Sequence, residues 1–224
     1  MRIAILVSGR GSNMLQLCDS IAEMQLPVEV ALVASNKECA GITAASERGI
    51  ATIIHDRAHF ADKRGQEQAL AASLRDAAID WVFLAGYMDV LSADFVTEFA
   101  DRIINIHPSL LPEFKGLDTH ERALAAQSTH HGASVHLVTA ALDDGPLIAQ
   151  AGLAISPGET ADELSARVLQ LEHCLYPLVL GALAKAQLSL EGGTVDWTDL
   201  PAALVNLPPA KQALITPALR TPAL

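Results

Sequence analysis

The sequence predicts an α/β protein built on an open, mostly parallel twisted sheet with helices on both faces. In the first half of the chain, short runs rich in β-branched residues alternate with longer segments of helical periodicity, which is typical of consecutive strand–helix–strand units. Aromatic residues make up 4% of a chain that is 50% hydrophobic, a balance that suits buried parallel strands better than a β-sandwich. A length of 224 residues favours one compact domain.

The elements of the first half follow one another in a regular order. Residues 3–7 are expected to form a buried strand, and Ser12 is expected to cap the helix that comes after it. The apolar face of that helix is formed by Met14, Leu17, Cys18 and Ile21. The same alternation predicts helices near 40–48 and 65–78 and strands at 28–34, 52–54, 81–85 and 103–106.

The second half begins with a segment that has neither strand nor helix periodicity. Two prolines and a glycine interrupt residues 107–116, so a loop is expected there. Two more strands are expected at 132–138 and 147–155. Thr160 and Glu163 form a capping box that opens a further helix, which is expected to lie across the sheet. Its apolar positions are Leu164, Val168 and Leu171.

The end of the chain has a different composition. Five of the 11 prolines lie between Pro201 and Pro222, and no glycine stands there to build tight turns. These residues are expected to form an irregular, peripheral tail. The predicted organisation is therefore a domain over residues 1–186 and a Pro-rich C-terminal extension over residues 187–224.

Charge and composition exclude several classes of partner. There are 15 basic and 26 acidic residues, a net charge of −11, so no nucleic acid partner is expected. The longest apolar stretch, residues 175–184, falls short of the roughly 18 residues that a membrane span needs, so no membrane association is expected. The 3 cysteines show no CxxC spacing and are interpreted as buried residues of a cytoplasmic protein.

A glycine-rich turn between the first strand and the first helix is the first candidate site. Backbone N–H groups at Gly11, Ser12 and Asn13 and the positive end of the helix dipole favour a phosphate or carboxylate there. Met14 stands where a dinucleotide fingerprint has its third glycine, and the lysine of a P-loop is absent, so neither NAD nor ATP is indicated. The alternative is an ordinary tight turn with a serine cap.

Asn105 and His107 are the second candidate site, at the carboxyl end of a predicted strand. Ligands of open α/β sheets bind at that edge. Residues two apart on a strand point to the same side, so the amide and the imidazole can converge on one substrate atom. This pair suits a developing oxyanion, as in attack on a carbonyl group, whereas a histidine without such a neighbour is more often structural.

Asp143 is the third candidate, in a turn over residues 142–146. Its carboxylate could reach the same pocket and set the charge or the tautomer of His107. The alternative is a plain turn, because Asp-Gly and Gly-Pro are ordinary turn sequences.

Histidines gather in the same part of the chain, which raises the question of a metal site. Five of the 8 lie between His107 and His136, and Asp143 or Asp144 could complete a ligand set. Their spacing matches no compact ligand motif, and His130 and His131 are expected in a solvated loop. No metal is therefore expected.

Several segments of residues 2–184 together resemble the folate-dependent formyltransferase superfamily. HPSLLP at 107–112 followed by LDDGP at 142–146 is specific to that superfamily, and the early GSN with LEHCLYP at 171–177 narrows the resemblance to the glycinamide ribonucleotide transformylase family. Further matching segments are SNK at 35–37, LAGYMDVLS at 84–92 and HGASVHLV at 131–138. The resemblance implies a Rossmann-like formyltransferase fold and transfer of a formyl group from 10-formyltetrahydrofolate to the amine of glycinamide ribonucleotide in purine biosynthesis.

The resemblance also implies a role for each candidate residue. Asn105 would bind the formyl oxygen, His107 as imidazolium would stabilise the tetrahedral oxyanion, and Asp143 would hold His107 charged. Glu172 would contact the ribose of the ribonucleotide, whose phosphate would lie on Gly11, Ser12 and Asn13. The folate pocket would comprise Asn105, the loop 139–143, Arg64 or its neighbour Lys63, Met88, Asp89, Val90 and Leu91. His136 and Ser134 would support the site without reacting.

Three positions depart from the family pattern. Asp89 stands where many relatives carry a basic residue, Asp118 where some carry histidine, and Leu137 where an aromatic residue is usual. An acidic Asp89 would not attract the glutamate tail of a folate, although backbone contacts at 88–91 do not depend on side-chain type.

Other functions remain as alternatives at this point. Within the superfamily these are methionyl-tRNA formyltransferase, which normally carries an additional C-terminal domain to hold tRNA, and formyltetrahydrofolate hydrolase, which carries an N-terminal regulatory module. A non-catalytic anion-binding module would keep the glycine-rich turn but would have no use for Asn105, His107 and Asp143. The chain is expected to be a monomer or a homodimer.

Overall fold

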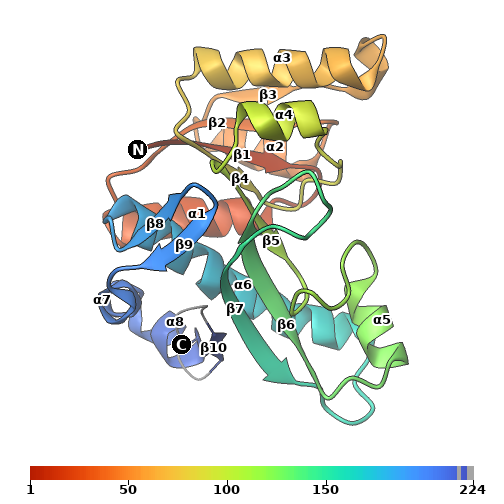
Figure 1. Cartoon of the computed structure of the whole chain (residues 1–224), viewed down its shortest axis with the longest axis vertical. Helices are drawn as coiled ribbons and strands as arrows, with labels where there is room; N and C mark the ends of the chain where they lie inside the picture. Colours follow the sequence, from red (N-terminus) through yellow and green to blue (C-terminus); the bar gives the residue numbers. More distant parts are fainter. Residues whose placement is uncertain (216–217, 221–224) are drawn as a thin grey trace.

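The computed structural model, which describes residues 1–215 and 218–220, centres on one eight-stranded sheet (Figure 1). In spatial order its strands are β10 (Leu219–Arg220), β7 (Leu147–Ala154), β6 (His130–Leu137), β5 (Ile103–His107), β4 (Trp81–Leu84), β1 (Arg2–Val7), β2 (Glu29–Ser35) and β3 (Thr52–Ile54). Strands β1 to β5 pair in parallel, whereas β6, β7 and β10 add an antiparallel end. The predicted α/β class is confirmed, and strands β1 to β7 begin and end within two residues of the predicted positions.

Helices cover both faces of the sheet because successive strand side chains point to opposite sides. On β1, Ile3 and Ile5 pack into one core, whereas Ala4 and Leu6 pack into the other. The first core is covered by α1 (Ser12–Glu23), α2 (Ala40–Glu47) and α6 (Ala161–Ala184). The second core is covered by α3 (Lys63–Asp76) and α4 (Ala93–Glu98). A short 3₁₀ turn (Arg57–His59), α4 and α5 (Thr119–Ala125) were not predicted from the periodicity.

The turn before α1 differs from the prediction at its cap. The N-cap residue is Gly11, in the left-handed conformation with a φ of 75°, and no side chain caps the helix. A Cβ atom on Gly11 would lie 2.7 Å from the Cα atom of Gly41, so the close packing of this turn on α2 requires glycine. The predicted Ser12 cap is wrong, because Ser12 is already the first residue of the helix and Gly11 is its N-cap.

Helix α6 lies across the sheet and starts as predicted. The Thr160 hydroxyl accepts from the Glu163 N–H while the Glu163 carboxylate accepts from the Thr160 N–H, so the capping box is confirmed. The buried Tyr176 hydroxyl lies 3.1 Å from the Leu84 carbonyl oxygen and 3.0 Å from that of Ile104, which ties α6 to β4 and β5. Within residues 1–215 and 218–220, no helix is long and apolar enough to cross a membrane.

Residues 187–215 and 218–220 contain regular helices and strands, so the prediction of an irregular tail is wrong for these residues. A hairpin of β8 (Leu188–Glu191) and β9 (Thr194–Trp197) leads into α7 (Leu200–Val205) and α8 (Pro209–Ile215), and β10 pairs with β7. Trp197 Nε1 donates to the Ile148 carbonyl at 3.0 Å, and Ile215 is fully buried in the first core. Pro201 and Pro209 stand at helix starts, where a missing N–H costs nothing. Pro217 and Pro222 lie outside the described residues.

Candidate active site

A cavity of about 590 Å³ opens at the carboxyl ends of β4 and β5. Four segments form its walls: the loop after β4, the end of β5, residues 116–121, and the loop that follows β6. Its volume is within the usual range of about 300–1,000 Å³ for small-molecule sites. The edge of the sheet predicted to bind a ligand therefore has room for one.

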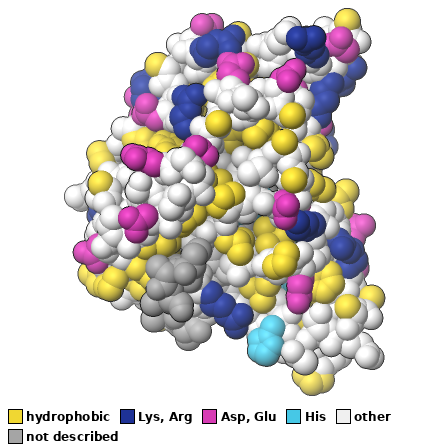
Figure 2. All heavy atoms as spheres, viewed as in Figure 1, with side chains coloured by type: hydrophobic (Ala, Val, Ile, Leu, Met, Phe, Trp, Pro, Cys, Tyr) yellow, Lys and Arg dark blue, Asp and Glu magenta, His cyan; other side chains and the backbone are white. Residues whose placement is uncertain are grey.

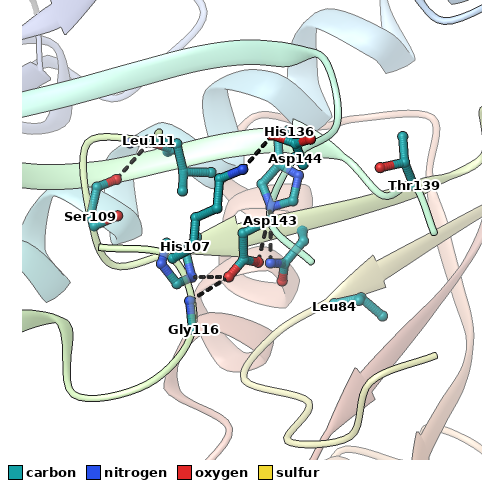
Figure 3. Close-up of polar contacts among 12 residues, drawn as sticks. Leu84, His107, Ser109, Leu111, Gly116, His136, Thr139, Asp143 and Asp144 are labelled. Atoms are coloured by element: carbon teal, nitrogen blue, oxygen red, sulfur yellow. Dashed lines mark hydrogen bonds and ion pairs between the residues drawn. The ribbon is translucent and has the colours of Figure 1, made fainter. Parts of the chain in front are cut away.

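Asn105, His107 and Asp143 all line this cavity. Figure 3 shows His107 beside Asp143. Asn105 and His107 lie two apart on β5, and His107 Nδ1 is 3.4 Å from Asp143 Oδ2. His107 Nε2 donates to the Phe114 carbonyl oxygen at 3.0 Å. Both ring nitrogens thus face oxygen acceptors, and only a doubly protonated ring can donate to both.

The backbone around Asp143 aims its carboxylate inward. Asp143 has a φ of 48°, in the left-handed region that Asp and Asn tolerate better than most residues. The Gly116 N–H donates to Asp143 Oδ2 at 2.9 Å, so a second loop fixes the carboxylate. At Gly145 a Cβ atom would lie 1.8 Å from the Leu137 carbonyl oxygen, so only glycine can close this turn.

His136 on β6 is the cross-strand partner of Asn105 and binds its side-chain amide. Its Nδ1 donates to the Leu137 carbonyl at 2.8 Å, and Asn105 Nδ2 donates to its Nε2 at 3.1 Å. Burial lowers the pKa of His136, and the Leu137 carbonyl and the Asp143 charge oppose this shift only in part. A neutral ring with the proton on Nδ1 fits both hydrogen bonds and orients Asn105 toward the cavity.

Ser134 fixes the start of the loop that follows His107. Its hydroxyl donates to the Ser109 carbonyl at 2.6 Å and accepts from the Leu111 N–H at 3.0 Å, and Gln150 Nε2 lies 2.8 Å away. Ser134 is completely buried and is paired with His107 across β5 and β6. Its contacts are those of a supporting residue, and it does not line the cavity.

A buried pair of polar side chains, Asn13 and Glu172, joins α1 to α6. Asn13 Nδ2 donates to Glu172 Oε2 at 2.6 Å, and both residues are buried. Burial raises the pKa of Glu172 to about 7, although the Asn13 hydrogen bond lowers it in part. Among the described residues Asn13 Oδ1 has no donor, so this pair retains hydrogen-bonding capacity for a ligand at the Gly11–Ser12 turn.

The predicted folate residues are only partly brought together. Met88, Asp89, Val90 and Leu91 line the cavity, and the Met88 N–H donates to the Ser8 hydroxyl at 2.9 Å, which joins this loop to the end of β1. Lys63 Nζ binds Asp89 Oδ1 at 2.9 Å and also the Val90 carbonyl. Arg64 is exposed and does not line the cavity. The structure therefore places Lys63, the alternative to Arg64, against this loop.

One histidine near the cavity differs from its predicted setting. His131 was expected in a solvated loop but is buried on β6, with its Nε2 atom 3.1 Å from His120 Nδ1. Burial, together with the nearby His120 and His107 rings, lowers the pKa of His131 to about 4. The loop prediction is wrong because β6 begins at His130, two residues earlier than expected.

Over residues 1–215 and 218–220, no group of three His, Cys, Asp or Glu residues could hold a metal ion.

The mixed α/β sheet brings an amide, an imidazole and a carboxylate to one cavity. The family model described as formyl transferase matches residues 1–180, which makes the chain an enzyme of that class. Phosphoribosylglycinamide formyltransferase of Escherichia coli K12 is 40% identical over 200 residues, which cover 89% of this chain and 94% of that relative. The chain belongs to the phosphoribosylglycinamide formyltransferase family. Family membership implies small-molecule substrates and a folate-type co-substrate.

Solved structures and a longer relative agree with this assignment. The phosphoribosylglycinamide formyltransferase of Coxiella burnetii, in complex with CHES, superposes with a TM-score of 0.84 at 40% identity, covering 88% of this chain and 93% of that one. The human trifunctional purine biosynthetic protein adenosine-3 is 37% identical over 198 residues, which cover 88% of this chain but 20% of that protein. The resemblance identified from the sequence motifs is confirmed.

Proposed function

We propose that this chain transfers the formyl group of 10-formyltetrahydrofolate to the amine of glycinamide ribonucleotide, giving formylglycinamide ribonucleotide and tetrahydrofolate in purine biosynthesis. The observation that carries the proposal is the meeting of Asn105, His107 and Asp143 at one cavity of a chain in this family. The shared topology alone would not be enough, because function resides in the site.

The reaction is direct attack of the substrate amine on the formyl carbon. The new C–N bond forms as the carbonyl electron pair moves to oxygen, and Asn105 Nδ2–H and protonated His107 donate to that oxyanion. The Phe114 carbonyl now accepts from His107 Nε2 at 3.0 Å, and a charged oxygen would displace it because charge-assisted hydrogen bonds are roughly twice as strong. Collapse breaks the bond to the folate N10 atom, which takes a proton as the amine loses one.

Asp143 acts on His107 and not on the substrate. Its carboxylate lies 3.4 Å from Nδ1 and stabilises the charged ring, while the Gly116 N–H keeps the carboxylate in place. His136 and Ser134 support this arrangement by orienting Asn105 and the loop after His107. These roles follow from the contacts of each side chain.

The ribonucleotide binds at the start of α1. The backbone at Gly11, Ser12 and Asn13 offers N–H groups to the phosphate at the positive end of a 12-residue helix. Glu172, which the Asn13 amide holds at 2.6 Å, contacts the ribose hydroxyls. An acidic protein can bind an anion here because the attraction is local.

The folate co-substrate occupies the 590 Å³ cavity, whose size suits a pterin ring and its aromatic linker. Asn105 and the loops 88–91 and 139–143 form its walls, and Met88, Val90 and Leu142 are exposed apolar side chains at the mouth. Of Arg64 and its neighbour Lys63, Lys63 is the residue that contacts the folate loop 88–91, because it binds Asp89. The mechanism uses no metal ion.

We further propose that residues 1–186 carry the activity and that residues 187–224 are an extension of that domain. The enzyme acts in the cytoplasm as a monomer or homodimer on its small-molecule substrates. Lys and Arg side chains are scattered among Asp and Glu on the face in Figure 2, which supports the absence of a nucleic acid partner.

A direct assay tests the proposed function. Purified protein is mixed with glycinamide ribonucleotide and 10-formyltetrahydrofolate, and the absorbance of the deformylated folate is followed while the formylated ribonucleotide is identified by mass. The proposal requires both products in equal amounts. Turnover only with charged initiator tRNA, or folate release without formylation of the ribonucleotide, would contradict it.

A further inference from the structure

A buried serine at the end of β1 links the backbone segments proposed to hold the two substrates. Ser8 is 4% exposed and does not line the cavity, and it directly precedes the turn 9–13 that carries the ribonucleotide site. Its N–H donates to the Gly86 carbonyl oxygen at 3.1 Å, and its hydroxyl accepts from the Met88 N–H at 2.9 Å. One residue therefore binds the loop after β4 at two points.

The Ser8 hydroxyl makes a further contact with the loop after β2. It donates to Asn36 Oδ1 at 2.7 Å, so its one proton is used there while a lone pair accepts from Met88. Within residues 1–215 and 218–220, the two hydrogen bonds that Ser8 makes with Gly86 and Met88 are the only ones between residues 8–13 and residues 85–91. The relative position of these two segments therefore depends on Ser8.

Each segment also has an anchor that does not involve Ser8. The Gly41 N–H donates to the Gly9 carbonyl oxygen at 2.9 Å, which fixes the turn after β1 on α2. The loop after β4 is held from α3, where Lys63 Nζ binds Asp89 Oδ1 at 2.9 Å. Removal of the Ser8 hydroxyl should therefore leave the shape of each segment intact and change their position relative to each other.

We infer that Ser8 is a positioning residue that sets the distance between the bound ribonucleotide and the bound folate, and so aligns the attacking amine with the formyl carbon. The inference rests on the proposed function, since it concerns the same two substrates. Reacting atoms must approach to about 3–3.5 Å, and a misplacement of about 1 Å can cost about a hundredfold in rate. A hydroxyl that joins the two segments thus acts on the rate of formyl transfer and not on the affinity for either ligand.

Ser8→Ala removes the hydroxyl and keeps the backbone bond to Gly86. Single-turnover kinetics of the full-length protein with glycinamide ribonucleotide and 10-formyltetrahydrofolate measures the chemical step. Calorimetry gives the Kd and the stoichiometry for glycinamide ribonucleotide and for tetrahydrofolate, each titrated alone. We expect the single-turnover rate to fall about 10- to 100-fold, with each Kd within about threefold of the wild type. An unchanged binding stoichiometry shows that the variant is folded.

Ser20→Ala is the matched control for this substitution. Ser20 is fully buried in α1, and its hydroxyl accepts from Lys211 Nζ of α8 at 2.8 Å, away from both substrate segments. The same loss of a buried serine hydroxyl should leave the single-turnover rate within about twofold of the wild type.

Asn36→Ala tests the contact with the loop after β2. Without its acceptor the Ser8 hydroxyl loses its orientation, so the single-turnover rate should fall. The double variant should be no slower than Ser8→Ala, because both substitutions break the same bond. Additive losses would show that Asn36 does not act through Ser8 and would contradict the inferred link.

The outcomes separate this inference from the proposed function. A Ser8→Ala rate within about twofold of the wild type, or a loss explained entirely by weaker binding of one ligand, overturns the inference while the proposed function stands. An equal loss of rate in Ser20→Ala overturns it as well. If the wild type forms no formylated ribonucleotide, the proposed function fails and the inference fails with it.

Discussion

The contact between Asp143 and His107 is the interaction that should cost most to remove. The atoms are 3.4 Å apart, and both side chains are largely buried at the cavity wall. With an effective dielectric constant of about 20, full charges at that distance attract by about 5 kcal/mol. Asp143→Asn removes the charge while keeping the shape, and asparagine tolerates the left-handed backbone at this position.

The expected loss of activity is smaller than the full Coulomb energy implies. The asparagine dipole retains part of the attraction, and water in the open cavity screens part of the rest. We therefore expect kcat to fall by about 10²- to 10³-fold, within the range of general acid–base catalysis, with little change in KM for the ribonucleotide. Steady-state kinetics at saturating folate measures both constants.

Asp144→Asn is the matched control for this prediction. Asp144 is the next residue, is more than half exposed and pairs with Lys115 instead of His107. Its replacement should change kcat by less than about twofold, because exposed ion pairs contribute little. If Asp143→Asn keeps activity within about threefold of the wild type, or if both variants lose activity equally, the Asp143 charge does not act through His107.

Three further predictions concern the scaffold. Gly145→Ala should lower Tm by several degrees in a thermal scan and abolish turnover, because its Cβ would overlap the Leu137 carbonyl; an unchanged Tm would contradict the contact. Burial raises the pKa of Glu172 from 4.5 to about 7, so the folded protein keeps this proton to a higher pH than the unfolded chain, and the free energy of unfolding must fall as pH rises from 4.5 to 7. Urea unfolding at pH 5 and pH 7.5 should therefore show a smaller fall in this free energy for Glu172→Gln than for the wild type. Equal falls in the two proteins would contradict the raised pKa. Ile215→Ala should cost about 2–5 kcal/mol of unfolding free energy and the exposed Val205→Ala under about 0.5, whereas equal effects would contradict the packing of the C-terminal segment on the core.

The part of the site that lies on a strand could be predicted because strand geometry is periodic. Asn105 and His107 point the same way for the reason that any residues two apart on β5 do. The folding back of the loop after β6 could not be derived in this way. It depends on the left-handed Asp143 and on the close approach of Gly145 to Leu137, and neither is a property of local sequence alone.

The position of the first turn of α3 places Lys63 against the 88–91 loop. The helix predicted from Gly65 begins at Lys63, because the Asp62 side chain accepts from the Gly65 N–H at 2.8 Å and caps it. The hydrophobic periodicity predicted which side of this helix is buried, but it did not predict the residue at which the helix begins. Asp62 was the available signal for the earlier start.

The helices of the C-terminal segment could not be predicted from its composition. Its prolines suggested an irregular tail, yet Pro201 and Pro209 start helices and Ile215 fills the first core. Proline is unfavourable inside a helix but favourable in its first turn, so proline content alone does not distinguish an irregular tail from a pair of short helices. The partner surfaces on α6 and β7 decide between them, and these are distant in sequence.

In the proposed mechanism His107 acts on the reacting formyl group and does not hold the ribonucleotide. Both kcat and the calorimetric Kd for glycinamide ribonucleotide are measured on the same preparation of His107→Ala. We expect kcat to fall by about a hundredfold or more, with Kd within about twofold of the wild type. Full activity in the variant, or a loss explained entirely by weaker ribonucleotide binding, would contradict it.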